Sequence, residues 1–132
     1  MRFPPALFPF ACGTAPPTSR AFVAIQGDRI YQRHTFDVPF FSQTTSFPLG
    51  PFILSQVSGT PILPAFVIRR RWLRYHVLMG DPIAVSRSGC KRDDAGLHEA
   101  MGEAVRFLEK TLATHYDQWM NYYDFWEVSS RN

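Results

Sequence analysis

The chain has 132 residues, of which 45% are hydrophobic and 19% are charged. These values are typical of one globular domain with a core, and they exclude an intrinsically disordered chain. The formal net charge of +3 is too small to indicate an anionic partner by itself. Cys12 and Cys90 lack metal-ligand spacing, so the sequence predicts no metal site and no disulfide framework, and a reducing compartment fits best.

Residues 1–20 show no secondary-structure period, and Pro4, Pro5 and Pro9 interrupt their apolar run. The sequence therefore predicts a loosely ordered leader over 1–20 and a domain over 21–132. The opening is similar to a secretory signal peptide, but its prolines break the helix that such a signal needs. No apolar run approaches the about 20 residues that a membrane-spanning helix requires.

Two apolar segments predict strands near the start of the domain. Ala21–Ile25 is continuously apolar and ends before Gly27, which favours a strand buried on both faces. Phe36–Phe41 is predicted to be extended, and Pro39 places it at the edge of a sheet.

A helix and a further strand are expected next. Phe52–Ser58 follows Pro51 and precedes Gly59, which is the usual asymmetry of helix ends. Pro61–Ile68 reads as another buried strand. The order strand, helix, strand predicts a right-handed parallel crossover.

A hairpin with an arginine-rich tip is predicted around residue 70. Trp72–Met79 alternates in the manner of a strand, and it follows Ile68 after only three residues. The tip would carry four arginines, which are Arg69, Arg70, Arg71 and Arg74.

The C-terminal third changes to helical periodicity. From Asp93 onward, apolar residues recur at spacings of three and four, which predicts an amphipathic helix of about twenty residues that packs across the sheet. Trp119, Tyr122, Tyr123 and Trp126 would share one face of a second, short helix if Asp117 caps it. Such an aromatic face suits either the core or a membrane interface.

The turn Gln26–Arg29 is the first candidate site. In alternating α/β folds, ligands lie beyond the carboxyl ends of strands, where Gly27 would let the backbone approach a ligand. Arg29 offers a permanent planar cation that suits phosphate or carboxylate. The alternative is an ordinary turn in which Asp28 and Arg29 pair with each other or with solvent.

A wider pattern of sequence blocks, of which this turn is the first, covers most of the domain. Its blocks are QGDR at 26–29, DVPFF at 37–41, FPLGPFILSQVSGTPILPAFVIR at 47–69, YHVLMGDPI at 75–83 and DQWMNYYDFW at 117–126. In order and spacing they resemble the C-terminal half of bacterial lysophospholipid acyltransferases, and most nearly the lipid A biosynthesis branch.

The resemblance implies an activity, a donor and a location. Such proteins transfer a fatty acyl group from an acyl carrier protein or coenzyme A thioester to a lipid hydroxyl, at the cytoplasmic face of the bacterial inner membrane. It also implies substrate-binding roles for Gly27, Asp28 and Arg29, where the broader superfamily has E-G-T-R and the arginine holds the acceptor's phosphate. Asp28 and Gln26 depart from that motif. Pro61 and Pro64 match the proline-rich strand that shapes the pocket wall.

The catalytic motif of the family, H-x4-D, is not matched upstream of residue 26. There the histidine is the general base and the aspartate orients it. HVLMGD at 76–81 and HEAMGE at 98–103 fit the spacing, but we interpret both as coincidental. His76 falls within a predicted strand, and side chains five positions apart on a helix, such as His98 and Glu103, point about 140° apart. The sequence therefore predicts no catalytic residue in this chain.

The arginine-rich tip is the second candidate site. Arg69, Arg70, Arg71 and Arg74 would receive anionic lipid headgroups or the acidic face of an acyl carrier protein, the alternative being a solvated turn. Arginines and aromatics also bind single-stranded nucleic acid, but no recognised motif accompanies them, so no nucleic-acid partner is expected.

Taken together, the expected fold is α/β, a mostly parallel sheet with packed helices in the manner of glycerolipid acyltransferases, with their N-terminal part missing. The first functional hypothesis is an acyltransferase-family protein that holds a phosphorylated acceptor and lacks the catalytic pair. The alternative is a catalytically silent remnant that binds a membrane or a carrier protein. Uncovered apolar surface would make the isolated chain self-associate.

Overall fold

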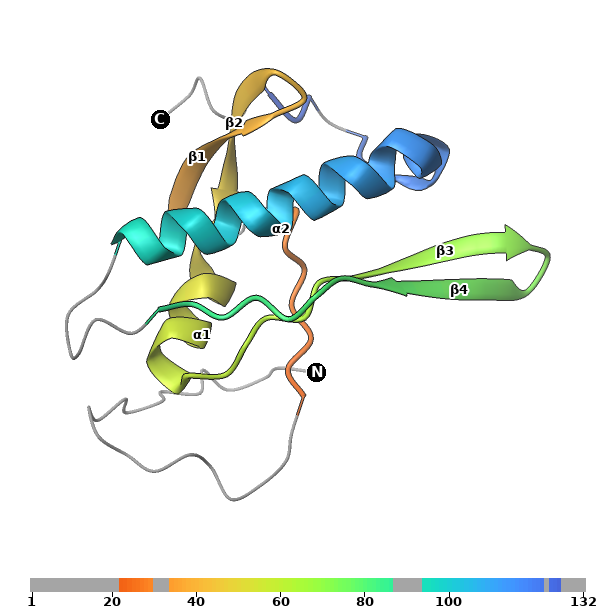
Figure 1. The fold of residues 1–132 in the computed structure, drawn as a ribbon. Helices are drawn as coiled ribbons and strands as arrows, with labels where there is room; N and C mark the ends of the chain where they lie inside the picture. The colour runs from red at the N-terminus through yellow and green to blue at the C-terminus, as the bar shows by residue number, and fades with distance from the viewer. Residues whose placement is uncertain (1–21, 30–33, 87–93, 123, 127–132) are drawn as a thin grey trace, which may run out of the picture.

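The computed structural model describes residues 22–29, 34–86, 94–122 and 124–126 (Figure 1). The predicted leader over 1–20 and both cysteines lie outside these residues. The elements in chain order are β1 (Thr35–Phe40), β2 (Gln43–Pro48), α1 (Gly50–Ser58), β3 (Ala65–Arg71), β4 (Arg74–Met79), α2 (Asp94–His115) and the 3-10 turn η1 (Tyr116–Gln118).

The strands form two antiparallel hairpins, β1–β2 and β3–β4, so the prediction of a mostly parallel sheet is wrong. The expected parallel crossover needs a strand on each side of α1 in one sheet. Here the strand before α1 pairs with β1, and the strand after it pairs with β4. Pairing with the nearest strand needs only a short loop, which costs less chain entropy than a long crossover.

The residues of the β1–β2 turn explain why this hairpin was not predicted from the sequence. Phe41 and Ser42 connect Phe40 to its cross-strand partner Gln43, and both have positive φ, 47° and 64°. Positive φ at both central positions is what a two-residue type I′ turn requires, and Asn-Gly is its usual signal. A phenylalanine and a serine in these positions give no such signal.

α1 begins and ends as its flanking residues predict. Pro51 lies in its first turn, and Gly59 closes it with a left-handed φ of 71° and a backbone hydrogen bond of 2.8 Å to the Ser55 carbonyl. Ile62 then forms an isolated antiparallel bridge with Ile83, and both backbone hydrogen bonds of this bridge measure 2.8 Å. This bridge fixes the base of the β3–β4 hairpin.

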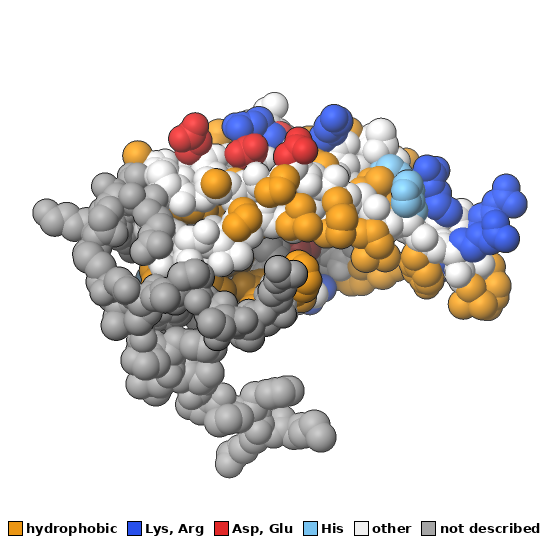
Figure 2. Space-filling model, turned by 60° about the horizontal axis from the view of Figure 1, so that its bottom comes forward, with side chains coloured by type: hydrophobic (Ala, Val, Ile, Leu, Met, Phe, Trp, Pro, Cys, Tyr) orange, Lys and Arg blue, Asp and Glu red, His pale blue; other side chains and the backbone are white. Residues whose placement is uncertain are grey.

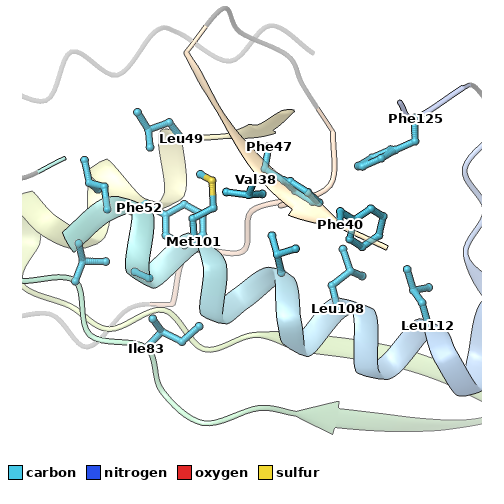
Figure 3. Packing of buried hydrophobic residues seen from close by; sticks show 14 residues of the cluster. Val38, Phe40, Phe47, Leu49, Phe52, Ile83, Met101, Leu108, Leu112 and Phe125 are labelled. Carbon is cyan, nitrogen blue, oxygen red and sulfur yellow. The ribbon is translucent and has the colours of Figure 1, made fainter. Parts of the chain in front are cut away.

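The amphipathic helix is confirmed as α2, which has 22 residues. It lies across the β1–β2 hairpin (Figure 1). Met101, Leu108 and Leu112 point from it towards strand side chains such as Phe40 and Val38 (Figure 3). These buried side chains form one core, which lies between α2, α1 and the β1–β2 hairpin.

The C-terminal aromatic residues do not form the predicted helix. Beyond η1 the chain is extended at Trp119 and turns at Phe125 and Trp126. Phe125 is buried, and its ring lies 5.5 Å from that of Phe40 and 5.1 Å from that of Trp119. Trp119 and Trp126 pack against the core whereas Tyr122 is exposed, so these three residues share no face. Tyr123 lies outside the described residues.

The segment predicted as a buried first strand is exposed. Phe22, Val23 and Ile25 lie in segment 22–26, which has no regular secondary structure and belongs to neither hairpin, and Phe22 is 100% exposed. A continuous apolar run predicts burial only if neighbouring strands cover it. In the part of the chain that is described, both sheets are complete as two-stranded hairpins without this segment.

Candidate functional site: the arginine-rich hairpin

The β3–β4 hairpin extends away from α1 and the β1–β2 hairpin (Figure 1). Arg71 pairs with Arg74 across its tip, and a bulge between Arg69 and Arg71 interrupts the register. The predicted hairpin is confirmed. All four arginines are exposed, because the tip projects beyond the body of the protein.

Two large apolar side chains form the turn itself. Trp72 is 86% exposed and Leu73 is 75% exposed, and both lie between the arginines of the tip. Leu73 has a φ of 57°, in the left-handed region that a leucine rarely adopts. The tip therefore presents two exposed apolar side chains between Arg71 and Arg74. Figure 2 shows hydrophobic side chains running to the end of the hairpin, with Lys and Arg side chains beside them.

One face of the hairpin is held against the body of the protein. The ring of Phe66 lies 5.4 Å from that of Phe107 on α2, and Ile68 is buried. The backbone of Arg69 exchanges two hydrogen bonds with the Gln118 side chain, of 2.7 Å and 3.2 Å. These contacts fix the direction in which the hairpin projects.

The candidate turn at 26–29 lies far along the chain from the arginine tip, in the exposed N-terminal segment. Gly27 has open space where a side chain would be, and Arg29 is exposed. Asp28 accepts a hydrogen bond of 3.2 Å from the indole Nε1 of Trp119, through its Oδ2. The structure thus brings together the first and last of the sequence blocks, QGDR and DQWMNYYDFW.

Of the two segments that fit the H-x4-D/E spacing, one begins on strand β4 and the other lies on helix α2. His76 is exposed on β4, and Asp81 follows the end of that strand. His98 lies on α2 with its ring stacked on Phe36 at 4.5 Å. Within the described residues, no group of three or more His, Cys, Asp or Glu side chains could hold a metal ion. The same residues contain no helix with the length and hydropathy of a membrane span.

Comparison with known proteins gives no match to a family model, to a curated protein or to a solved structure. The acyltransferase resemblance and the roles that it implies for Gly27, Asp28 and Arg29 therefore stay predictions. The candidate site rests on the geometry of the chain itself.

Sequence reasoning found the arginines of the tip but missed its apolar part. The alternation over Trp72–Met79 predicts a strand, and this is confirmed for Arg74–Met79 only, because Trp72 and Leu73 lie in the turn. The signal was present, because Trp72 and Leu73 interrupt a run of arginines at the turn, where solvated polar residues are usual.

Proposed function

We propose that this chain binds anionic lipid surfaces through the tip of the β3–β4 hairpin. The observation that carries the proposal is the exposure of Trp72 and Leu73 between Arg71 and Arg74. Exposed apolar groups are costly at a turn unless something covers them, and an anionic bilayer supplies both an apolar interior and negative headgroups. Tryptophan also prefers the headgroup level of a membrane.

Binding at the tip would have an electrostatic and an apolar contribution. Each basic residue near an anionic surface contributes about 1 kcal/mol, so four arginines contribute about 4 kcal/mol, or close to a thousandfold in affinity. This attraction weakens within a Debye length of about 8 Å at physiological salt. Insertion of the Trp72 and Leu73 side chains adds a contribution that salt does not screen.

An acyl carrier protein is the other partner that was expected at these arginines. Its acidic surface would match the cations of the tip but would leave Trp72 and Leu73 exposed to water. A lipid surface accounts for both features, and for that reason we favour it.

The test is co-sedimentation of the purified chain with vesicles of phosphatidylglycerol and phosphatidylcholine, compared with phosphatidylcholine alone. We expect binding to the anionic vesicles only, reduced in 0.5 M salt as screening predicts. Replacement of Arg69, Arg70, Arg71 and Arg74 by serine should abolish binding. A matched control replaces Arg106 of α2 and leaves the tip intact. Equal binding by the tip variant and the wild type would overturn the proposal.

We propose as a second function that the turn at 26–29 holds a phosphorylated lipid acceptor in an acyltransferase. The resemblance supports this assignment, and the hydrogen bond between Asp28 and Trp119 supports it by joining two of the resembling blocks. Gly27 would admit the acceptor's phosphate close to the backbone, and Arg29 would pair with that phosphate. The acyl group would come from a carrier-protein or coenzyme A thioester.

Binding of lysophosphatidic acid by the full chain tests this second proposal. We expect Arg29→Ala to weaken binding by about tenfold, as loss of one charged hydrogen bond does, and Arg106→Ala to leave it unchanged. If this chain alone transfers an acyl group and His76→Ala abolishes the transfer, then His76 of HVLMGD is catalytic. The prediction that the chain has no catalytic residue would then be wrong.

A further inference from the structure

The two faces of the β3–β4 hairpin differ in what covers them. Side chains of successive residues on a strand point to opposite faces, and directly paired residues point to the same face. The pairs Phe66–Leu78 and Ile68–His76 therefore form one face, and we call it the inner face because Phe66 packs on Phe107 of α2 and Ile68 is buried.

The opposite, outer face is apolar along most of its length. It is formed by the pairs Ala65–Met79, Val67–Val77 and Arg69–Tyr75. Every member of these pairs is exposed, and the exposed fractions of Val67 and Met79 are 65% and 64%. From the base of the hairpin outwards, this face thus changes from aliphatic side chains to a tyrosine and an arginine, and the exposed Trp72 follows in the turn.

We infer that the hairpin lies along the lipid surface, with its whole outer face, and not its tip alone, in the membrane interface. This inference rests on the proposed function, since it requires that the tip binds lipid. The outer face would sit among the upper acyl chains, with Arg69 and Tyr75 at headgroup level, and the inner face would stay on the protein side.

The charges near the outer face favour a lipid over a second copy of the chain. Two copies that met through this face with parallel hairpins would bring their Arg69 side chains, together with Arg70, Arg71 and Arg74 at the tip, into the same region. An antiparallel pair would instead cover each Arg69 with the aliphatic side chains of the other copy. Like charges at close range repel, and the described part of the hairpin carries no carboxylate in β3 or β4 to offset them. Anionic headgroups neutralise the same cluster, and tyrosine and tryptophan are enriched where headgroups meet acyl chains.

Neighbouring residues of β4 provide a matched pair for the test. Val77 lies on the outer face and His76 on the inner face, and both are exposed in the absence of lipid. In a chain whose Cys12 and Cys90 are replaced by serine, we would introduce Val77→Cys or His76→Cys and attach an environment-sensitive fluorophore. Vesicles of phosphatidylglycerol and phosphatidylcholine would then be added, some of them carrying a quencher on the acyl chain.

We expect the label at position 77 to brighten several-fold and to be quenched by the acyl-chain group, and the label at position 76 to change little. Equal responses at both positions, with binding retained, would overturn this inference and leave the proposed function standing. Absence of any binding by the wild-type chain would overturn both. Brightening at position 77 without vesicles, at rising protein concentration, would show that a second copy covers the face.

A substitution series provides an independent measurement. Replacement of Val67, Val77 and Met79 by serine leaves every arginine in place, and we expect it to weaken vesicle binding by about tenfold and to leave the dependence on salt unchanged. Val57→Ser, at an exposed position of α1, is the control and should bind as the wild type does. Circular dichroism checks that both variants are folded. Unchanged binding by the triple variant would contradict the inference.

Discussion

The side-chain amide of Gln118 forms two hydrogen bonds with the backbone of Arg69. Its Oε1 accepts from the Arg69 N–H at 2.7 Å, and its Nε2 donates to the Arg69 carbonyl at 3.2 Å. An amide side chain here takes the part that a neighbouring strand would take, at the residue where the β3–β4 register begins to shift. This contact joins the turn after α2 to the hairpin that carries the candidate site.

Loss of the Gln118 side chain should loosen the hairpin without unfolding the core. We expect Gln118→Ala to lower the free energy of unfolding by about 1–2 kcal/mol, because two partly exposed hydrogen bonds are lost. Hydrogen exchange at the Arg69 amide measures the effect locally and should become faster. Gln118→Glu retains the acceptor but not the donor, so its effect should be smaller. Unchanged exchange at Arg69 in Gln118→Ala would show that the contact does not hold the hairpin.

Gly80 allows β4 to pass close to α2. A Cβ at this position would lie 3.2 Å from two ring carbons of Phe107, so Gly80→Ala forces the ring or the strand to move. We expect a destabilisation of about 1–2 kcal/mol by thermal unfolding. Gly50→Ala is the control, since a Cβ there meets open space, and it should be neutral or stabilising at the start of α1. Adding Phe107→Leu should reduce the cost of Gly80→Ala, and strict additivity of the two changes would contradict this explanation.

Ser42 is a position where glycine should stabilise the fold. Its φ of 64° is in the left-handed region, which costs a serine more than a glycine. We expect Ser42→Gly to raise the free energy of unfolding by about 0.5–1 kcal/mol and the Tm by a few degrees. Thr44→Gly, in the extended part of β2, should lower both. A lower Tm for Ser42→Gly would mean that the β1–β2 turn does not have this conformation.

Thr45 ties β2 to the C-terminal segment. Its buried hydroxyl donates a hydrogen bond of 2.9 Å to the Phe125 carbonyl. Thr45→Val keeps the shape of the side chain and removes the donor, so we expect a loss of about 1–2 kcal/mol in chemical denaturation. Thr44→Val, at the exposed neighbouring position, should stay within about 0.5 kcal/mol of the wild type. Equal stabilities for the two variants would argue against a structural role for the Phe125 contact.

The arginine cluster could be placed on a hairpin tip from sequence, whereas the surface beside it could not. Alternation along Trp72–Met79 assigns Val77 and His76 to opposite faces. The alternation does not say which face meets the rest of the protein. That depends on long-range contacts such as the one between Phe66 and Phe107, which lie 41 positions apart in the sequence. The candidate turn at 26–29 shows the same limit, since its bond to Trp119 joins residues 91 positions apart.

Three local elements of this protein follow from short-range patterns in its sequence. The period of the apolar residues specified α2, the proline and glycine that flank α1 set its ends, and the short spacing after Ile68 specified the β3–β4 hairpin. Strand pairing and the burial of apolar runs depend instead on contacts between distant segments. Phe41 and Ser42 adopt a turn that their types do not favour, so β1 pairs with β2 and the expected parallel sheet does not form. Local preferences act within a few residues, whereas strand partners and burial depend on the free energy of the whole packed chain.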